Sequence, residues 1–398
     1  MSMNINLLKN TLFTIILLLP LLIQPVFSQW YYSLYLEQEY NTNPFAFPEA
    51  DDDQISRFSL GLQKDWSKVS AQYFGSYHMF SQNSDRSFYW QQFFMSGGDS
   101  TSWSFLAENR LNRPEYIIYD YLTLRAGVNH NQLLKDFLWR LSGGVALNNF
   151  FEIQDINNLI FNIYTSVQRS FFTRTSFIGT AALNYKYYLQ EIPQADSVQT
   201  FIQSFSQLHQ GGGQGPGHGG PGEGGGYQVY VPTSEQRGLT QMLLTLRAAQ
   251  ALTSSTGLAI QFQTSINFNE DDRSVTGLIY GYSTESQIFD DPMGYESNMF
   301  GSELTQLLPY QMSIKVAGYY QQKNYVAQGI YLDAVNYDQS LLREDIYRTV
   351  WATLEKRFSV WDSGLALQLN FQWINNSSNS YWYDYESQFF SLGLQADL

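Results

Sequence analysis

Ser76 and His78 are the two residues of this sequence best placed for nucleophilic chemistry. They are two positions apart in a segment of alternating apolar residues, so both side chains fall on one face of a β-strand. A serine hydrolase also needs a polar group that orients the histidine, and two residues of such common types are weak grounds for one. The other candidate base, His130, falls in a predicted short turn. We therefore predict that the protein is not an enzyme.

A glycine-rich stretch, HQGGGQGPGHGGPGEGGG at residues 209–226, has a composition that can bind phosphate or a metal. A phosphate-binding loop places its glycines between a strand and a helix and follows them with Lys-Ser or Lys-Thr, which this stretch lacks. Its two histidines, His209 and His218, have neither a fixed ligand spacing nor a third ligand. A segment so poor in apolar side chains is expected to be mobile. We predict a solvated loop that binds no metal and no cofactor.

Alternating apolar and polar residues run through most of the chain. In LAIQFQTSINFN, residues 258–269, the apolar positions fall on one side of a strand and the Gln, Ser and Asn residues on the other. Residues 365–373 repeat this pattern. A soluble β-sandwich also alternates, but its outer face carries charges, whereas the polar face here is mostly Gln, Asn, Ser, Thr, Gly and Tyr. Such a face suits a water-filled interior.

The alternation divides the chain into strand segments, many of them roughly 10 to 14 residues long. A tilted strand needs about 9–11 residues to cross a bilayer, which is longer than most strands of soluble proteins. We therefore predict an all-β fold, a transmembrane antiparallel up-and-down β-barrel of about 16 strands, with 14 or 18 strands as the alternatives. The predicted strands are 30–40, 55–64, 69–80, 87–96, 102–110, 118–129, 136–148, 158–169, 172–189, 238–251, 256–269, 298–308, 311–322, 345–356, 363–374 and 385–398.

The connections between the predicted strands alternate between short turns and long loops. The long loops are 41–54, 190–237, 270–297 and 323–344. Outer-membrane barrels place short turns in the periplasm and long loops outside the cell. The glycine-rich stretch therefore lies in the longest outward loop, 190–237, and is not a linker between domains. An even number of strands places both the N- and C-termini in the periplasm.

The first 28 residues, 1–28, have the features of an export signal peptide. Lys9 precedes an apolar run from Leu12 to Phe27, and Ser28 suits the cleavage site, so the mature chain is predicted to begin at Gln29. An uncleaved anchor is the alternative, because the apolar run is nearly long enough to span a bilayer. No stop-transfer pattern follows the run, which favours cleavage. Residues 29–398 then form one barrel domain.

The composition excludes several classes of protein. The chain has no cysteine, so it has neither disulfides nor thiolate metal sites. Its formal net charge of −14 argues against a nucleic-acid partner, which would need a basic face. Aromatic residues make up 17 % of the chain although its mean hydropathy is slightly negative. Belts of Tyr, Trp and Phe at two lipid–water interfaces would account for both properties.

Both ends of the predicted barrel resemble those of Gram-negative outer-membrane β-barrels, and in size the chain is similar to general porins. The first strand and its exit, YLEQEYNTNPF at 35–45, are similar to a Tyr–Asn signature in porin-like families. The last strand alternates outward to the final residue and resembles the terminal signal read by the barrel-assembly machinery. The family usually ends in Phe or Trp, whereas this chain ends in Leu. The outward residues are Phe390, Leu392, Leu394, Ala396 and Leu398.

This resemblance implies where the protein resides and what it contacts. It implies an integral protein of the cell outer membrane, surrounded by outer-membrane lipid and inserted by the barrel-assembly machinery. Porins of this size often form trimers, so the resemblance also implies a homotrimer. The residues themselves do not define the oligomeric state.

Five cations are predicted to point into the lumen in the periplasmic half of the barrel. A narrow pore lined by one sign of charge favours the opposite ion, so this basic zone would select anions. The alternative is that each cation pairs with a neighbouring carboxylate or bonds to Tyr and Gln side chains across the lumen. The five residues are Arg125, Arg140, Arg174, Arg247 and Lys315.

The predicted outward loops are acidic. These carboxylates could attract cations to the mouth or bridge calcium, but the ordered Asp spacing and the Gly of a calcium loop are missing. Solvated loop charge is the default expectation. The residues are Glu49, Asp51, Asp52, Asp53, Glu270, Asp271, Asp272, Asp290 and Asp291.

The expected function is passive passage of small hydrophilic solutes or ions, because about sixteen strands leave an aqueous bore. The alternative is a non-conducting structural or interaction barrel, such as an adhesin-like scaffold or an outer-membrane part of an export machine. Its lumen would be packed with side chains and would leave no path for water. The solute itself is not defined by the sequence.

Overall fold

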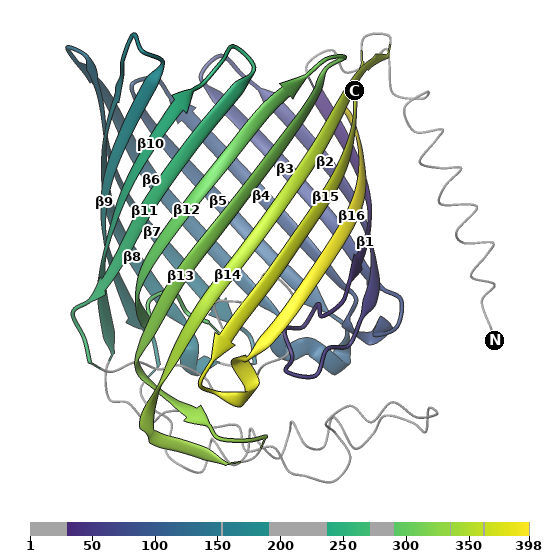
Figure 1. The fold of residues 1–398 in the computed structure, drawn as a ribbon, viewed down its shortest axis with the longest axis vertical. Helices are drawn as coiled ribbons and strands as arrows, with labels where there is room; N and C mark the ends of the chain where they lie inside the picture. The colour runs from purple at the N-terminus through teal and green to yellow at the C-terminus, as the bar shows by residue number, and fades with distance from the viewer. Residues whose placement is uncertain are drawn as a thin grey trace, which may run out of the picture.

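The structure is a computed structural model that describes residues 30–152, 154–190, 237–270, 290–334, 336–360 and 363–397. Sixteen antiparallel strands form one closed barrel (Figure 1), as predicted from the sequence. The strands are β1 (Trp30–Asn41), β2 (Asp53–Asp65), β3 (Val69–Phe80), β4 (Phe88–Gly98), β5 (Thr101–Asn112), β6 (Tyr121–Leu134), β7 (Phe137–Phe150), β8 (Asn158–Ser170), β9 (Thr175–Tyr188), β10 (Gly238–Ala251), β11 (Thr256–Asn267), β12 (Tyr295–Leu308), β13 (Met312–Tyr331), β14 (Tyr337–Val360), β15 (Ser363–Ser378) and β16 (Tyr385–Asp397).

The barrel closes where the first strand pairs with the last. β1 lies between β2 and β16, with Ser33 opposite Asp397 on one side and Trp30 opposite Lys64 on the other. Each strand from β2 to β15 pairs with its two neighbours in sequence. None of the sixteen described strands has an unpaired edge, which is the condition for strands to cross a bilayer. With an even strand count, the start of β1 and the end of β16 lie at the same rim as the short turns (Figure 1).

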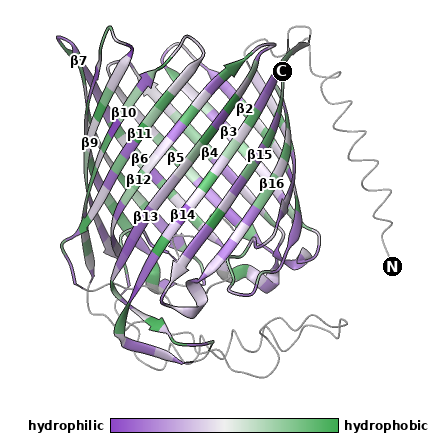
Figure 2. Cartoon of the chain, in the orientation of Figure 1, coloured by the Kyte–Doolittle hydropathy of each residue, from purple (hydrophilic) through white to green (hydrophobic). Residues whose placement is uncertain are grey.

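Alternation along the strands separates an apolar outside from a polar inside. On β11, Leu258, Ile260 and Phe262 are 38 %, 46 % and 45 % exposed, whereas Ser265 is 5 % exposed. Apolar and polar residues alternate along the strands all around the wall (Figure 2). In water this apolar surface would be unfavourable, but hydrocarbon tails would cover it in a bilayer. Among the described residues, no helix has the length and apolar composition to cross a bilayer.

The β13–β14 hairpin extends beyond the wall at the rim opposite the short turns (Figure 1). Residues 323–344 were predicted to form a loop, and that prediction is wrong, because most of them belong to the extended ends of these two strands. The pairing register shifts between Asn324 and Gly329, which interrupts the alternation that identified the other strands. A Cβ at Gly329 would lie 2.5 Å from the carbonyl oxygen of Asp338, so the close approach of the two strands there requires glycine.

Short 3-10 helices and aromatic clusters occupy the same rim as this hairpin. The helices are η1 (Ser84–Arg86), η2 (Pro114–Tyr119), η3 (Gln154–Ile156) and η5 (Tyr381–Tyr383). Trp382 and Tyr383 of η5 pack against Tyr331 at the end of β13, which holds the tip of the hairpin against η5. The predicted signal peptide and the glycine-rich stretch with His209 and His218 lie outside the described residues.

Candidate functional site

The lumen is the candidate site, and four of the five predicted cations face it. Strand alternation places Arg125, Arg140, Arg247 and Lys315 on the same face as buried inward residues of their strands. The last three lie near the short turns. Arg125 is closer to the middle of β6, because this strand continues to Leu134, beyond its predicted end at residue 129.

Arg174 is not part of this lumen set. It lies in the turn before β9, with a φ of 62°, and its backbone N–H donates to the carbonyl of Phe171. The predicted strand 172–189 began too early, because β9 starts at Thr175 and Phe172 belongs to the turn before it.

The lumen cations differ in what they contact. The guanidinium of Arg247 lies 3.7 Å from the carboxylate of Glu303 on β12, which is the pairing that the sequence left open as an alternative. The Nε of Arg140 donates to the side-chain oxygen of Asn131 at 2.9 Å. Within the described part of the chain, Arg125 and Lys315 have no hydrogen bond or ion pair from their side chains and are exposed. Both side chains are therefore exposed on the inner face with no partner among the described residues.

Several further charges on the inner face were not expected from the sequence. Arg57 pairs with Glu37 at 2.9 Å, and the guanidinium of Arg110 lies 3.6 Å from the ring centroid of Phe88. Their inward positions follow from the alternation of β2 and β5, so the pattern alone could have identified them. The inner face is therefore charged in both signs, and the cations do not form an isolated basic zone.

The predicted acidic loop residues do not share one environment. Asp51 and Asp52 are exposed, as expected for solvated loop charge. Asp53, however, is fully buried at the start of β2, where its carboxylate accepts backbone N–H groups from Ser81, Gln82 and Asn83 at 2.9–3.0 Å. It therefore stabilises the β3–η1 connection. Asp271 and Asp272 lie outside the described residues.

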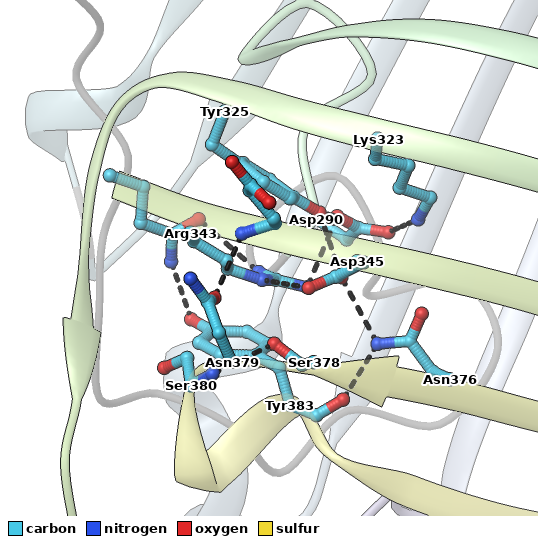
Figure 3. Close-up of polar contacts among 12 residues, drawn as sticks. Asp290, Lys323, Tyr325, Arg343, Asp345, Asn376, Ser378, Asn379, Ser380 and Tyr383 are labelled. Carbon is cyan, nitrogen blue, oxygen red and sulfur yellow. Dashed lines mark hydrogen bonds and ion pairs between the residues drawn. The ribbon is translucent and has the colours of Figure 1, made fainter. Parts of the chain in front are cut away.

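Asp290 and Asp291 form ion pairs with lysine side chains on the inner wall, so they do not form a solvated acidic mouth. The carboxylate of Asp290 contacts the ammonium of Lys323 and the hydroxyl of Tyr325, both on β13 (Figure 3). Burial alone would raise the pKa of Asp290, but the charges of Lys323 and Arg343 outweigh it, so the pKa of this carboxyl lies below its usual value. The next residue, Asp291, pairs with Lys186 of β9, and the two side chains are only 12 % and 6 % exposed.

Arg343 forms the centre of a buried cluster beside Asp290. Its Nε donates to Asp345 at 2.9 Å, and a second guanidinium nitrogen contacts the other carboxylate oxygen (Figure 3). The guanidinium lies between two aromatic rings, 3.4 Å from the centroid of Tyr383 and 4.1 Å from that of Tyr325. The cluster joins β13, β14 and η5 to the end of the β11–β12 connection. Neither Lys323 nor Arg343 was singled out from the sequence, because both were placed in a loop.

The inward segment 291–293 closes one side of a cavity of about 270 Å³ against the inner wall. The wall residues come from β8 to β13 and are mainly amides and hydroxyls, with the paired Lys186 at the edge.

Ser76 and His78 are brought together, but not in an accessible place. The hydroxyl of Ser76 lies 3.0 Å from Nε2 of His78, and the two residues are 4 % and 5 % exposed. The imidazole stacks on Phe88, with ring centroids 4.4 Å apart. A substrate would have to displace this packing to reach the hydroxyl, so the pair acts as part of the wall.

The terminal strand has the predicted orientation. Phe390, Leu392 and Leu394 are 51 %, 48 % and 39 % exposed on the outer face of β16, which pairs with β1 and β15. Leu398 lies outside the described residues.

Solved outer-membrane proteins have a similar fold. The outer membrane protein OpdK from Pseudomonas aeruginosa aligns with a TM-score of 0.50 and 10 % identity, over 93 % of this chain and 98 % of its own. The chain has the fold of an outer-membrane porin. OpdK with vanillate gives a TM-score of 0.50 at 9 % identity, again over 93 % and 98 % of the two chains. No family model matches this porin-like chain, and no curated protein matches it.

Proposed function

We propose that the protein is an outer-membrane channel for passive passage of small hydrophilic solutes or ions. One observation carries the proposal: the sixteen-strand wall is closed and presents Gln, Asn, Ser, Arg and Glu side chains to its interior. Barrels of about this strand number leave an aqueous bore, whereas about eight strands are filled by their own side chains. The short turns then face the periplasm and the β13–β14 hairpin faces the cell exterior.

Conductance across a planar lipid bilayer tests this proposal. Protein refolded in detergent, with heat-modifiable migration in electrophoresis as the check of folding, is added to one side of the bilayer. We expect stepwise increases in current. A silent bilayer at high concentrations of folded protein would favour the alternative, a structural or interaction barrel whose lumen has no water-wide path.

We further propose a weak preference for anions, which rests on the exposed cations Arg125, Arg140 and Lys315. Low-dielectric walls strengthen the field of such charges on a passing ion. Replacing all three with Gln should shift the reversal potential in a salt gradient toward cations. The matched control is Arg174→Gln, which removes a cation from the turn and should leave the reversal potential unchanged. Cation preference in the unmodified protein would contradict the proposal.

A further inference from the structure

The cavity beneath segment 291–293 is preformed, because side chains of the inner wall hold this segment in place. The side-chain amide of Gln241 donates to the carbonyl of Pro292 at 2.7 Å, and that of Asn267 donates to the carbonyl of Met293 at 3.0 Å. Together with the Lys186–Asp291 ion pair, these bonds hold the segment to β9, β10 and β11. The cavity therefore exists before any solute enters, which lowers the entropic cost of binding.

The polar groups of the cavity still have hydrogen-bonding capacity. Gln241 uses its amide nitrogen on protein acceptors, which leaves its side-chain oxygen as an acceptor. Gln263 accepts from Thr245 through its oxygen at 3.3 Å, which leaves its amide nitrogen as a donor. Asn184 has no side-chain hydrogen bond to any residue that the structure describes. The wall thus presents both donors and acceptors within one small volume.

The charges at the cavity are already neutralised. Lys186 and Asp291 pair with each other and are largely buried, so neither offers a free charge to a solute. An ionic solute would lose hydration without gaining a counter-charge. A hydroxyl group, which both donates and accepts, matches the mixed amide lining. Tyr295 and Leu243 add apolar surface that suits the C–H face of a sugar ring.

From this lining we propose that the cavity is a binding subsite for a neutral polyhydroxylated solute of monosaccharide size. The volume of about 270 Å³ lies just below the range of about 300–1,000 Å³ typical of pockets for drug-sized ligands, so it suits one ring. The inference rests on the proposed channel function and specifies its solute class.

Block of the channel current by D-glucose tests the subsite. We expect glucose to reduce the current through the unmodified channel in a saturable way. Gln263→Ala and Asn184→Ala should each raise the half-blocking concentration about 3- to 10-fold, because each removes hydrogen bonds to the sugar. Gln261→Ala is the matched control. Gln261 lies on the same strand and face but outside the cavity lining, so its variant should retain the unmodified half-blocking concentration.

The outcomes separate the subsite from the channel. A conducting protein that glucose does not block, or whose block is unchanged in both cavity variants, overturns the subsite and leaves the channel intact. Stronger block by gluconate than by glucose overturns the neutral class. If the protein does not conduct, calorimetric titration with glucose in detergent decides the subsite. Binding that Gln263→Ala weakens would support it, and absence of binding would overturn it.

Discussion

At the scale of single residues, a pair of oppositely charged side chains is buried at the rim opposite the short turns. The Arg343 and Asp345 side chains are 2 % and 0 % exposed, and they contact each other through two hydrogen bonds. Such a pair adds little stability over apolar residues of similar shape, but loss of one partner leaves an unpaired buried charge. Its role here is to fix the geometry of β13, β14 and η5.

Arg343→Ala should therefore lower the free energy of unfolding by about 3–5 kcal/mol, because Asp345 would remain buried without its counter-charge. Urea unfolding in phospholipid vesicles, followed by the fluorescence of the 9 tryptophans, measures the change. Arg140→Ala is the control, because Arg140 is exposed and makes one hydrogen bond to a side chain. Equal effects of the two variants would show that the buried cluster has no special role.

Asp290 should make the stability of the protein dependent on pH. Because its pKa in the folded protein is lowered, its ionised form stabilises the fold above the ordinary value of about 3.9, and this contribution is lost as the pH falls through the lowered value. Asp290→Asn should lower the free energy of unfolding at pH 7 by roughly 1.5–3 kcal/mol.

The difference between the two proteins should shrink as the pH falls below the ordinary carboxyl pKa of about 3.9, because Asp290 then becomes protonated in the unmodified chain. Urea unfolding at several pH values provides the measurement. Asp51→Asn, at an exposed loop position, should change the free energy by less than about 0.5 kcal/mol throughout. A constant difference for Asp290→Asn across this range would contradict the assignment.

At the scale of elements, period-two alternation was sufficient to place most strands. On β11 the apolar residues from Leu258 to Ile266 face outward and the Gln and Ser residues face inward, as predicted. The pattern failed where strands leave the bilayer. In the β13–β14 extension both faces of the strands contact water or protein, so neither face has to be apolar. A register shift near Gly329 also interrupts the alternation there.

The contacts of the candidate site were harder to predict than the strands. Alternation gives the face of a residue but not its partner on another strand. The pairing of Arg247 with Glu303, and of Lys186 with Asp291, joins residues 56 and 105 positions apart. These contacts depend on the strand register and on the path of the β11–β12 connection, and neither can be read from local sequence.

Charge placed on the two faces of one strand should have unequal effects. Leu369 is 46 % exposed on the outer face of β15, so Leu369→Arg should destabilise the barrel in vesicles, lowering its free energy of unfolding by about 2–4 kcal/mol. Gln368 points inward and donates to Glu355 at 3.2 Å, so Gln368→Arg places the new cation beside a carboxylate and should be tolerated. Folding yields in vesicles, read from heat-modifiable migration, compare the two. Equal losses would contradict the assigned faces.

At the scale of the whole molecule, the two rims of the barrel differ in construction. One rim has the short turns, the start of β1 and the end of β16, and the other has the β13–β14 hairpin and η5 (Figure 1). Segment 291–293 lies just before β12 at this second rim. A solute that enters from the second rim would meet the amide-lined cavity before the cations Arg140 and Lys315 near the short turns. The order of these features fits a path that first selects by hydrogen bonding and then by charge.

The central claim is that the interior of this closed barrel is a continuous aqueous path. The natural absence of cysteine permits a direct test with single-cysteine variants of β11 in planar bilayers. A charged, water-soluble thiol reagent should lower the current through Gln261→Cys and Gln263→Cys, because these positions face the lumen. It should leave Ile260→Cys and Phe262→Cys unchanged, because lipid covers them. Equal reaction on both faces, or folded inward variants whose current never changes, would contradict the claim.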